Sequence, residues 1–178
     1  VDGFRIDAVK HVTWGWEYSL ANSIYTFGDS FLFGEWFEGN TSDPLYRDSY
    51  KFANKSGISL LDFPLNTAIR NVFGSNSNFS DIDSVISTEG SNFTWKEDLV
   101  TFIDNHDMAR FLSLNNNNNR LHEALAFTLT SRGIPTHLSL VIDSRTRGQL
   151  REAADLAESV GAHELHYILP QPVAASVM

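Results

Sequence analysis

Three short apolar segments of this chain each lead into a carboxylate. The carboxylates are Asp7, Glu35 and Asp107, and the residues before them have the apolar content of short β-strands. The carboxyl ends of parallel strands in an α/β barrel meet on one face, so we expect the three side chains to converge. Two carboxylates across a sugar–sugar bond can cleave it, one as nucleophile or base and the other as acid. A single acidic residue is more simply a solvated loop charge, but three at strand ends favour a site.

The neighbours of two of these carboxylates suit different chemical tasks. Residues two apart in a strand share a face, so we expect Arg5 to lie beside Asp7 and, with Lys10 nearby, to keep it ionised as a nucleophile must be. Glu35 is flanked by aromatic residues, an apolar setting that favours the protonated form of an acid. The sequence therefore predicts a nucleophile and acid pair.

Three further residues near these carboxylates allow more than one interpretation. Trp36 fits a sugar contact and plain core packing equally well. Phe37 comes after the strand end, so a sugar-stacking platform is favoured there over packing. His11 could contribute to a binding site, or it could be a helix-entry residue whose imidazole has no ligand.

These segments resemble the conserved regions of the α-amylase family of glycoside hydrolases, over roughly residues 1–135. Within that family the likeness is greatest to cyclodextrin glucanotransferases and maltogenic α-amylases. Four more runs carry the resemblance: Phe52–Gly57, Leu60–Phe63, Arg70–Gly74 and Ala124–Gly133. Ordered matches of this length are far more specific than a single motif.

The resemblance implies a role for each matching residue. Asp7 would be the nucleophile that forms a covalent glycosyl-enzyme, and Glu35 the general acid and later the base. Asp107, helped by His106, would bind sugar hydroxyls and stabilise the transition state, while Arg5 would orient Asp7. Retaining enzymes of this kind need the nucleophile and acid carboxyls about 5–5.5 Å apart.

The resemblance also implies an acceptor-sugar side and a structural calcium ion. Lys10, His11 and Phe37 would lie on the leaving-group side of the scissile bond. The family's Ca²⁺ site takes a main-chain carbonyl from the residue that matches His11. The family's early Asp and Asn-His motif, which supplies other ligands, is not in this chain, so we expect an incomplete calcium site.

The expected fold is α/β, a partial (β/α)8 TIM barrel whose opening strands are absent and whose C-terminal end is atypical. The chain has 178 residues, whereas a whole barrel typically takes about 250. We expect a catalytic part over residues 1–135 and an unrecognised tail over 136–178, because Thr136–Asp143 stands where the family has an aromatic strand. The tail includes a helical pattern over Gly148–Val160, and its histidines are interpreted as non-functional: His137, His163 and His166.

The predicted function is a retaining glycoside hydrolase or transglycosylase acting on α-1,4-glucans by double displacement. The alternative is an inactive fragment that keeps the motifs without turnover. A starch-binding module is a weaker alternative, because a paired acid and nucleophile would then have no purpose. By resemblance the parent enzyme is expected to be monomeric and secreted, although no signal peptide opens this chain.

Composition excludes several other classes of function. The net charge is −9 with a pI near 5.0, so no basic stripe is available to neutralise nucleic-acid phosphates. No apolar run approaches the length of a membrane span. The absence of cysteine excludes a disulfide framework and a thiol nucleophile.

Strand and helix patterns alternate along the chain, as is typical of α/β proteins. The expected elements after the first strand are a helix over Trp14–Tyr25, a turn at Gly28-Asp29 into a second strand that ends at Glu35, a long polar loop over residues 38–56, a strand over Ile58–Phe63, a helix over Leu65–Phe73, a short helix over Ile82–Ile86, a strand before Asp104, a loop over Asn115–Asn119 and a helix over Leu121–Ser131.

Overall fold

A parallel β-sheet of three strands organises the first half of the chain. The computed structural model describes residues 2–132, 137–141 and 164–168. Strands β1 (Gly3–Ile6), β2 (Phe31–Gly34) and β3 (Ser59–Leu60) pair in that order, all parallel. Beyond β3, one parallel bridge joins Leu61 to Val100. A parallel sheet with helical connections is consistent with part of an α/β barrel.

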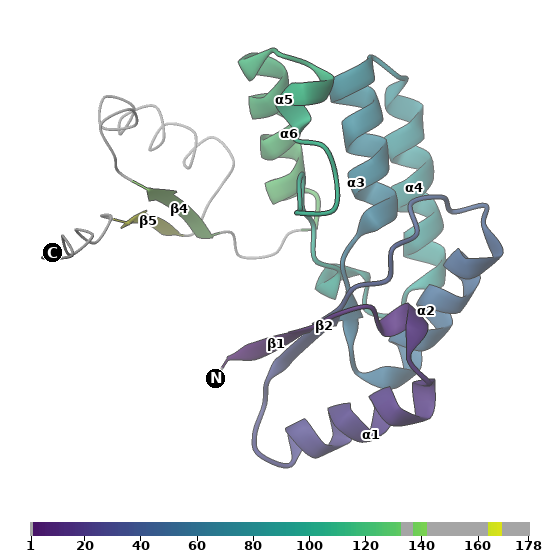
Figure 1. The fold of residues 1–178 in the computed structure, drawn as a ribbon. Helices are drawn as coiled ribbons and strands as arrows, with labels where there is room; N and C mark the ends of the chain where they lie inside the picture. The colour runs from purple at the N-terminus through teal and green to yellow at the C-terminus, as the bar shows by residue number, and fades with distance from the viewer. Residues whose placement is uncertain (1, 133–136, 142–163, 169–178) are drawn as a thin grey trace, which may run out of the picture.

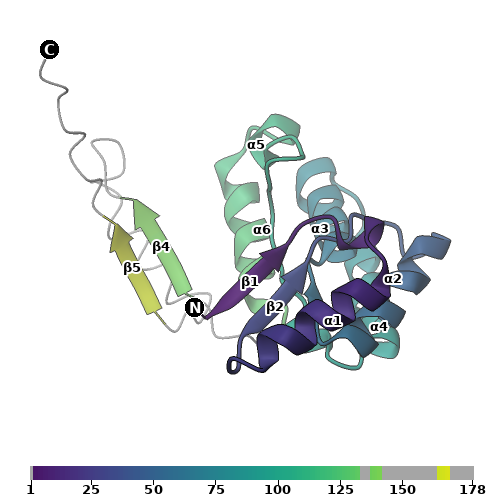
Figure 2. The same ribbon diagram turned by 60° about the horizontal axis from the view of Figure 1, so that its bottom comes forward.

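Helices connect the strands and then form a bundle beside the sheet (Figure 1). Helix α1 lies alongside the strands (Figure 2), and α1 and α2 are the two crossovers of the sheet. The bundle is built from α3, α4, α5 and α6. The helical elements are η1 (Val9–His11), α1 (Trp14–Tyr25), α2 (Pro44–Ser56), α3 (Phe63–Ile69), the π-helical turn η2 (Arg70–Gly74), α4 (Phe79–Asn92), η3 (Lys96–Asp98), α5 (Phe111–Leu114) and α6 (Asn118–Thr130).

The polar segment expected to be a loop over residues 38–56 is instead mostly helix α2. Asp43 caps it by accepting a hydrogen bond from the Leu45 main-chain N–H at 2.8 Å, and Pro44 occupies the first turn, where its missing N–H is not needed. Gly57 ends the helix with φ 71°, a left-handed conformation that glycine adopts without strain.

The strand expected over Ile58–Phe63 stops at Leu60 because Asp62 begins the next helix. Its side chain accepts a hydrogen bond from the Leu65 main-chain N–H at 3.0 Å, so α3 starts at Phe63. The strand expected before Asp104 is reduced to a single parallel bridge at Val100, which exchanges hydrogen bonds with Leu60 and Asp62. Apart from the Val100 bridge, the described residues there form no strand.

Two helices begin earlier than the apolar pattern predicts, because asparagine caps lie upstream of it. Asn78 accepts a hydrogen bond from the Ser80 N–H at 3.1 Å, which starts α4 at Phe79. Asn117 accepts bonds from two main-chain N–H groups, so α6 begins inside the asparagine tract expected to be a loop. Side-chain amides satisfy the free N–H groups of a first helical turn.

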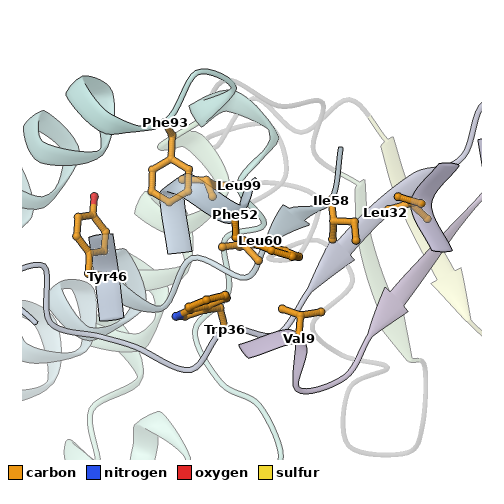
Figure 3. Close-up of a cluster of buried hydrophobic side chains, with 10 residues drawn as sticks. Val9, Leu32, Trp36, Tyr46, Phe52, Ile58, Leu60, Phe93 and Leu99 are labelled. Carbon is orange, nitrogen blue, oxygen red and sulfur yellow. The ribbon is translucent and has the colours of Figure 1, made fainter. Parts of the chain in front are cut away.

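An apolar core fills the space between the sheet and its two crossover helices (Figure 3). Trp36 is 4% exposed and packs on Phe52, with ring centroids 5.6 Å apart. The packing interpretation of Trp36 is therefore correct. The buried members of this core are Val9, Ala21, Leu32, Trp36, Tyr46, Phe52, Ile58, Leu60, Phe93 and Leu99.

A second core lies within the bundle, and a buried ionic cluster lies next to residues of the first core. Phe111 and Ile69 are fully buried in this second core. Arg132 donates to Asp62 Oδ2 from Nη2 at 2.5 Å and from Nε at 3.2 Å, and it also pairs with Glu89. We call Asp62, Glu89 and Arg132 the buried cluster.

Two further strands lie in the tail. Strands β4 (His137–Val141) and β5 (Glu164–Ile168) pair with each other in parallel and not with the first sheet. The helix expected over Gly148–Val160 lies outside the described residues. Among the helices that the structure describes, none has the length and apolar content needed to cross a bilayer.

Candidate active site

The ends of β1 and β2 bring Asp7 and Glu35 together. The last paired residues of these strands are Ile6 and Gly34, so Asp7 and Glu35 are the next residues in register. The Glu35 main-chain N–H donates to the Ile6 carbonyl at 2.9 Å, which extends the pairing by one step. Two predicted site residues therefore lie side by side although they are far apart in sequence.

Arg5 lies between the two carboxylates and contacts both. Its Nη1 donates to Asp7 Oδ1 at 2.7 Å, and its Nη2 donates to Glu35 Oε2 at 3.2 Å. Hydrogen bonding to Arg5 is the largest cause that holds the pKa of Asp7 below its ordinary value, and hydrogen bonding to the Glu35 carboxyl is the second. The Arg5–Asp7 contact predicted from strand periodicity is confirmed.

The surroundings of Glu35 are more polar than its sequence neighbours predict. Its carboxylate accepts from the Ala8 main-chain N–H at 3.4 Å as well as from Arg5. The adjacent Trp36 points away into the core (Figure 3). Consecutive residues of an extended chain face opposite sides, so the apolar setting expected for Glu35 is wrong.

Two backbone features hold this arrangement in place. Ala8 adopts a left-handed conformation with φ 48°, which is uncommon for a residue other than glycine. The chain then folds back so that Val9 packs on Gly34, where a Cβ atom would lie 2.7 Å from Val9 Cγ1. A side chain at position 34 would therefore displace Val9 and the turn η1 that follows β1.

Lys10 and Phe37 form a second contact across the strand ends. Lys10 Nζ donates to the Phe37 carbonyl at 2.6 Å. Lys10 is therefore directed to Phe37, and it is not among the groups that lower the pKa of Asp7, contrary to the expectation from the sequence. The Phe37 side chain is 48% exposed, and its ring centroid lies 4.5 Å from that of Phe63. Phe37 thus has an accessible aromatic surface, and its ring packs against Phe63.

Asp107 lies on an exposed turn and is not in direct contact with the other two carboxylates. Its carboxylate pairs with His106 Nε2 at 3.2 Å, and this is its side chain's one ion pair among the described residues. The charge of His106 contributes to lowering the pKa of Asp7, so the turn lies within electrostatic reach of Asp7. Asp7 and Glu35 are therefore connected through hydrogen bonds to Arg5, whereas Asp107 shares no hydrogen bond with either of them among the described residues.

The main-chain carbonyl of His11 stays the one calcium ligand that the resemblance assigns to this chain. His11 is exposed at the end of η1. Nowhere in residues 2–132, 137–141 and 164–168 do three or more His, Cys, Asp or Glu side chains gather as metal ligands would. A carbonyl from His11 alone cannot supply the six to eight oxygens that Ca²⁺ takes.

Residues that sequence reasoning did not select hold the turn that carries Asp107. Arg70 and Asn66, both on the helical segment after β3, donate hydrogen bonds to main-chain carbonyls just before that turn. Their signal in the sequence is weak: two polar residues among the apolar residues of a helix. A cavity of about 370 Å³, lined in part by Phe31 and Ser59 at the starts of β2 and β3, lies away from all of these groups.

Known proteins resemble this chain closely over three quarters of its length. A cyclomaltodextrin glucanotransferase of Bacillus sp. (strain 6.6.3) is 54% identical over 136 residues, which are 76% of this chain and 19% of that protein. The corresponding enzyme of Bacillus licheniformis is 52% identical over the same share. An α-amylase of Niallia circulans is 46% identical over 137 residues, 76% of this chain and 25% of that protein. No family model matches the chain.

Solved structures agree with these relatives. CldA, a cyclomaltodextrin glucanotransferase with a three-domain ABC distribution, superposes with a TM-score of 0.71 at 49% identity, covering 73% of this chain and 27% of CldA. An α-amylase from Malbranchea cinnamomea gives a TM-score of 0.63 at 25% identity, covering 72% of this chain and 26% of that one.

The parallel strands, the connecting helices and these similarities are consistent with part of an α/β barrel. The matched residues belong to the α-amylase family. Within it they are similar to cyclomaltodextrin glucanotransferases, of whose length the chain spans about 19%.

Proposed function

We propose that this chain carries the reacting groups of a retaining enzyme that cleaves or transfers α-1,4-linked glucans. The observation that carries the proposal is the single guanidinium of Arg5 bound to both Asp7 and Glu35. Two carboxylates that share one guanidinium lie close together, as the nucleophile and acid of a retaining enzyme must. The relatives, named as glucanotransferases and an α-amylase, support the same substrate class.

The proposed reaction divides into two displacements at the anomeric carbon. Glu35 protonates the leaving oxygen while the Asp7 carboxylate attacks, which breaks the sugar–sugar bond and forms a glycosyl ester. Glu35 then takes a proton from water or from a sugar hydroxyl, and that oxygen displaces Asp7. The low pKa of Asp7 keeps it ionised for the first attack.

Other groups have supporting roles in this proposal. Asp107 and His106 bind hydroxyls of the sugar being cleaved, and Phe37 stacks against the acceptor sugar. Lys10 and His11 lie on the same acceptor side. By likeness to the family, the parent enzyme is a secreted monomer with a structural calcium ion completed by residues other than those described.

A second candidate is an inactive fragment, and one observation favours it. The carboxylate of Asp107 pairs only with His106 among the described residues, so only two of the three proposed carboxylates are in contact through Arg5. Catalytic groups must be held within about 0.5 Å of their productive positions. The motifs alone would then not give turnover.

The experiment that separates the two candidates measures release of reducing sugar and cyclodextrin from soluble starch, with calcium, by the 178-residue chain. Glu35→Gln removes the proposed acid. Glu123→Gln is the matched control, since Glu123 is an exposed residue that pairs with Arg120 on α6. Activity lost in Glu35→Gln and kept in Glu123→Gln supports the enzyme. No activity in the unchanged chain supports the inactive fragment.

A further test isolates the nucleophile. We expect Asp7→Asn to reduce turnover by at least about 10³-fold, because the glycosyl ester cannot form. Binding of maltoheptaose, followed by calorimetry, should change little. Substantial residual turnover in Asp7→Asn would remove Asp7 from the mechanism.

A further inference from the structure

The segment from Phe102 to Phe111 carries Asp107 but has little structure of its own. It contains no helix or strand between those two residues, and His106 and Asp107 are exposed on it. Two hydrogen bonds lie within it: the Asp107 N–H donates to Asn105 Oδ1 at 3.0 Å, which shapes the turn, and the Phe111 N–H donates to Asp104 Oδ2 at 2.9 Å. Contacts from outside the segment must therefore fix where the Asp107 carboxylate lies.

Arg70 supplies most of those contacts. It is 9% exposed, and its Nη1 donates to the Ile103 carbonyl at 3.0 Å and pairs with the Asp104 carboxylate. Its Nη2 donates to the Ala109 carbonyl at 2.6 Å. One guanidinium thus holds the segment on both sides of Asp107.

Two neighbouring groups strengthen the same attachment. Asn66, one turn before Arg70 on α3, donates from Nδ2 to the carbonyls of Phe102 and Ile103 at 2.9 and 3.0 Å. Asp104 uses its second oxygen to accept from the Phe111 main-chain N–H at 2.9 Å, where α5 begins. Asp104 therefore connects Arg70 to the far end of the segment.

The planar guanidinium is the group that this geometry requires. Its separate nitrogens reach acceptors in different directions at the same time, whereas a lysine ammonium is a single point donor on a flexible stem. Arg70 also opens the π-helical turn η2, a local departure from the α-helix that is frequent at functional sites.

We propose that Arg70 is a positioning residue for Asp107: it fixes the place of that carboxylate relative to Asp7 and Glu35 without touching the sugar. The proposal rests on the proposed function insofar as Asp107 binds the glucan. Its structural half, that Arg70 holds residues 103–109 in one arrangement, stands independently of turnover.

The test compares Arg70→Lys with Arg120→Lys in the 178-residue chain. Arg120 is a matched control because it pairs with Glu123 and Asn76 on the surface and makes no contact with the segment. Amide hydrogen exchange should become at least tenfold faster at the Asp107 and Phe111 N–H groups in Arg70→Lys, because both are hydrogen-bonded within the segment that Arg70 holds. The sheet and α1 should keep their protection, and Arg120→Lys should behave as the unchanged chain.

Maltoheptaose binding and turnover supply the second measurement. We expect Arg70→Lys to lower kcat/KM at least tenfold, and the double variant Arg70→Lys/Asp107→Asn to be no worse than Asp107→Asn alone. Guanidinium ion added to Arg70→Ala should restore part of the loss. Fully additive losses, or no rescue, would overturn the positioning role.

The exchange experiment distinguishes failure of this inference from failure of the proposed function. If the unchanged chain neither binds nor cleaves maltoheptaose, the function fails while exchange at the Asp107 and Phe111 N–H groups still tests Arg70. Unchanged exchange there in Arg70→Lys would overturn the inference. Exchange that rises equally throughout the chain would also overturn it, since Arg70 would then only stabilise the fold.

Discussion

Two arginines in this molecule each pair with two carboxylates, one at the surface and one in the interior. In the surface group the side chains of Arg5, Asp7 and Glu35 are 37%, 73% and 11% exposed. In the buried cluster, the three side chains are 4% exposed at most. Each group contains one arginine, one aspartate and one glutamate, so the two groups differ mainly in how deeply they are buried.

The pKa of a carboxyl is shifted in opposite directions in the two groups, and burial is the cause. At the surface, hydrogen bonding to Arg5 holds the pKa of Asp7 low. In the interior, desolvation and then the charge of Asp62 raise the pKa of Glu89 to about 9, although Arg132 acts in the opposite direction. Beside a partly exposed arginine the Asp7 carboxyl stays ionised, whereas in the core the Glu89 carboxyl keeps its proton although Arg132 lies next to it.

The largest expected effect comes from removing each arginine in turn. Arg132→Met should lower the free energy of unfolding by about 3–5 kcal/mol, because it leaves buried Asp62 without its counter-charge. Arg5→Met should lower it by no more than about 1 kcal/mol, as for other exposed ion pairs. Urea unfolding at neutral pH measures both, and equal losses would contradict the comparison.

The next effect is a pH dependence specific to the buried cluster. Between the ordinary carboxyl pKa of 4.5 and about 9, the folded chain keeps the Glu89 proton and the unfolded chain releases it. The unfolded state then binds fewer protons, so the contribution of Glu89 to stability falls as pH rises through this interval. Glu89→Gln removes the titrating group.

Thermal unfolding from pH 5 to 9 tests this dependence. Relative to the unchanged chain, the Tm of Glu89→Gln should rise towards pH 9 by at least about 2–4 °C, the shift that 1 kcal/mol gives in a domain of this size. Glu123→Gln, at an exposed pair, should follow the unchanged chain. Parallel Tm curves for all three proteins would show that Glu89 does not hold the proton.

The smallest effect concerns the surface group, where we expect a change in the titration of Asp7 and only a small change in stability. Arg5→Met should raise the pKa of Asp7 towards its ordinary value, because the first cause of its lowering is the hydrogen bond from Arg5. Carbon-13 NMR of the Asp7 carboxyl measures the shift directly. An unchanged titration in Arg5→Met would assign the low pKa to another group.

Local sequence patterns predicted the part of the site that local structure builds. Arg5 and Asp7 share a face because a strand repeats every two residues, and Asp7 meets Glu35 because two short apolar strands pair in parallel register. Asp43 and Pro44 are a typical start signal for a helix and indicate α2, whereas the polar composition of the segment favours a loop. Here the capping residues are the better guide, because they satisfy the first turn whatever the composition that follows.

Contacts between distant residues were beyond the reach of such patterns. Arg70 donates hydrogen bonds to the carbonyls of Ile103 and Ala109, which lie 33 and 39 residues away in the sequence. No helix or strand periodicity links Arg70 to these two residues. The buried cluster joins Arg132 to Asp62 across 70 residues. In the sequence these are ordinary charged residues, and only the packing of three helices places them in the core.

That separation of 70 residues sets an order of events as the chain is made. Asp62 and Glu89 leave the ribosome before Arg132, so for a time the two acids have no cation to pair with. During that interval the packing of α3 against α4 would bury Asp62 without its counter-charge. The arrival of Arg132, just after the end of α6, therefore completes this part of the molecule, and a nascent chain halted before residue 132 should expose the α3–α4 contact more often than the whole chain does.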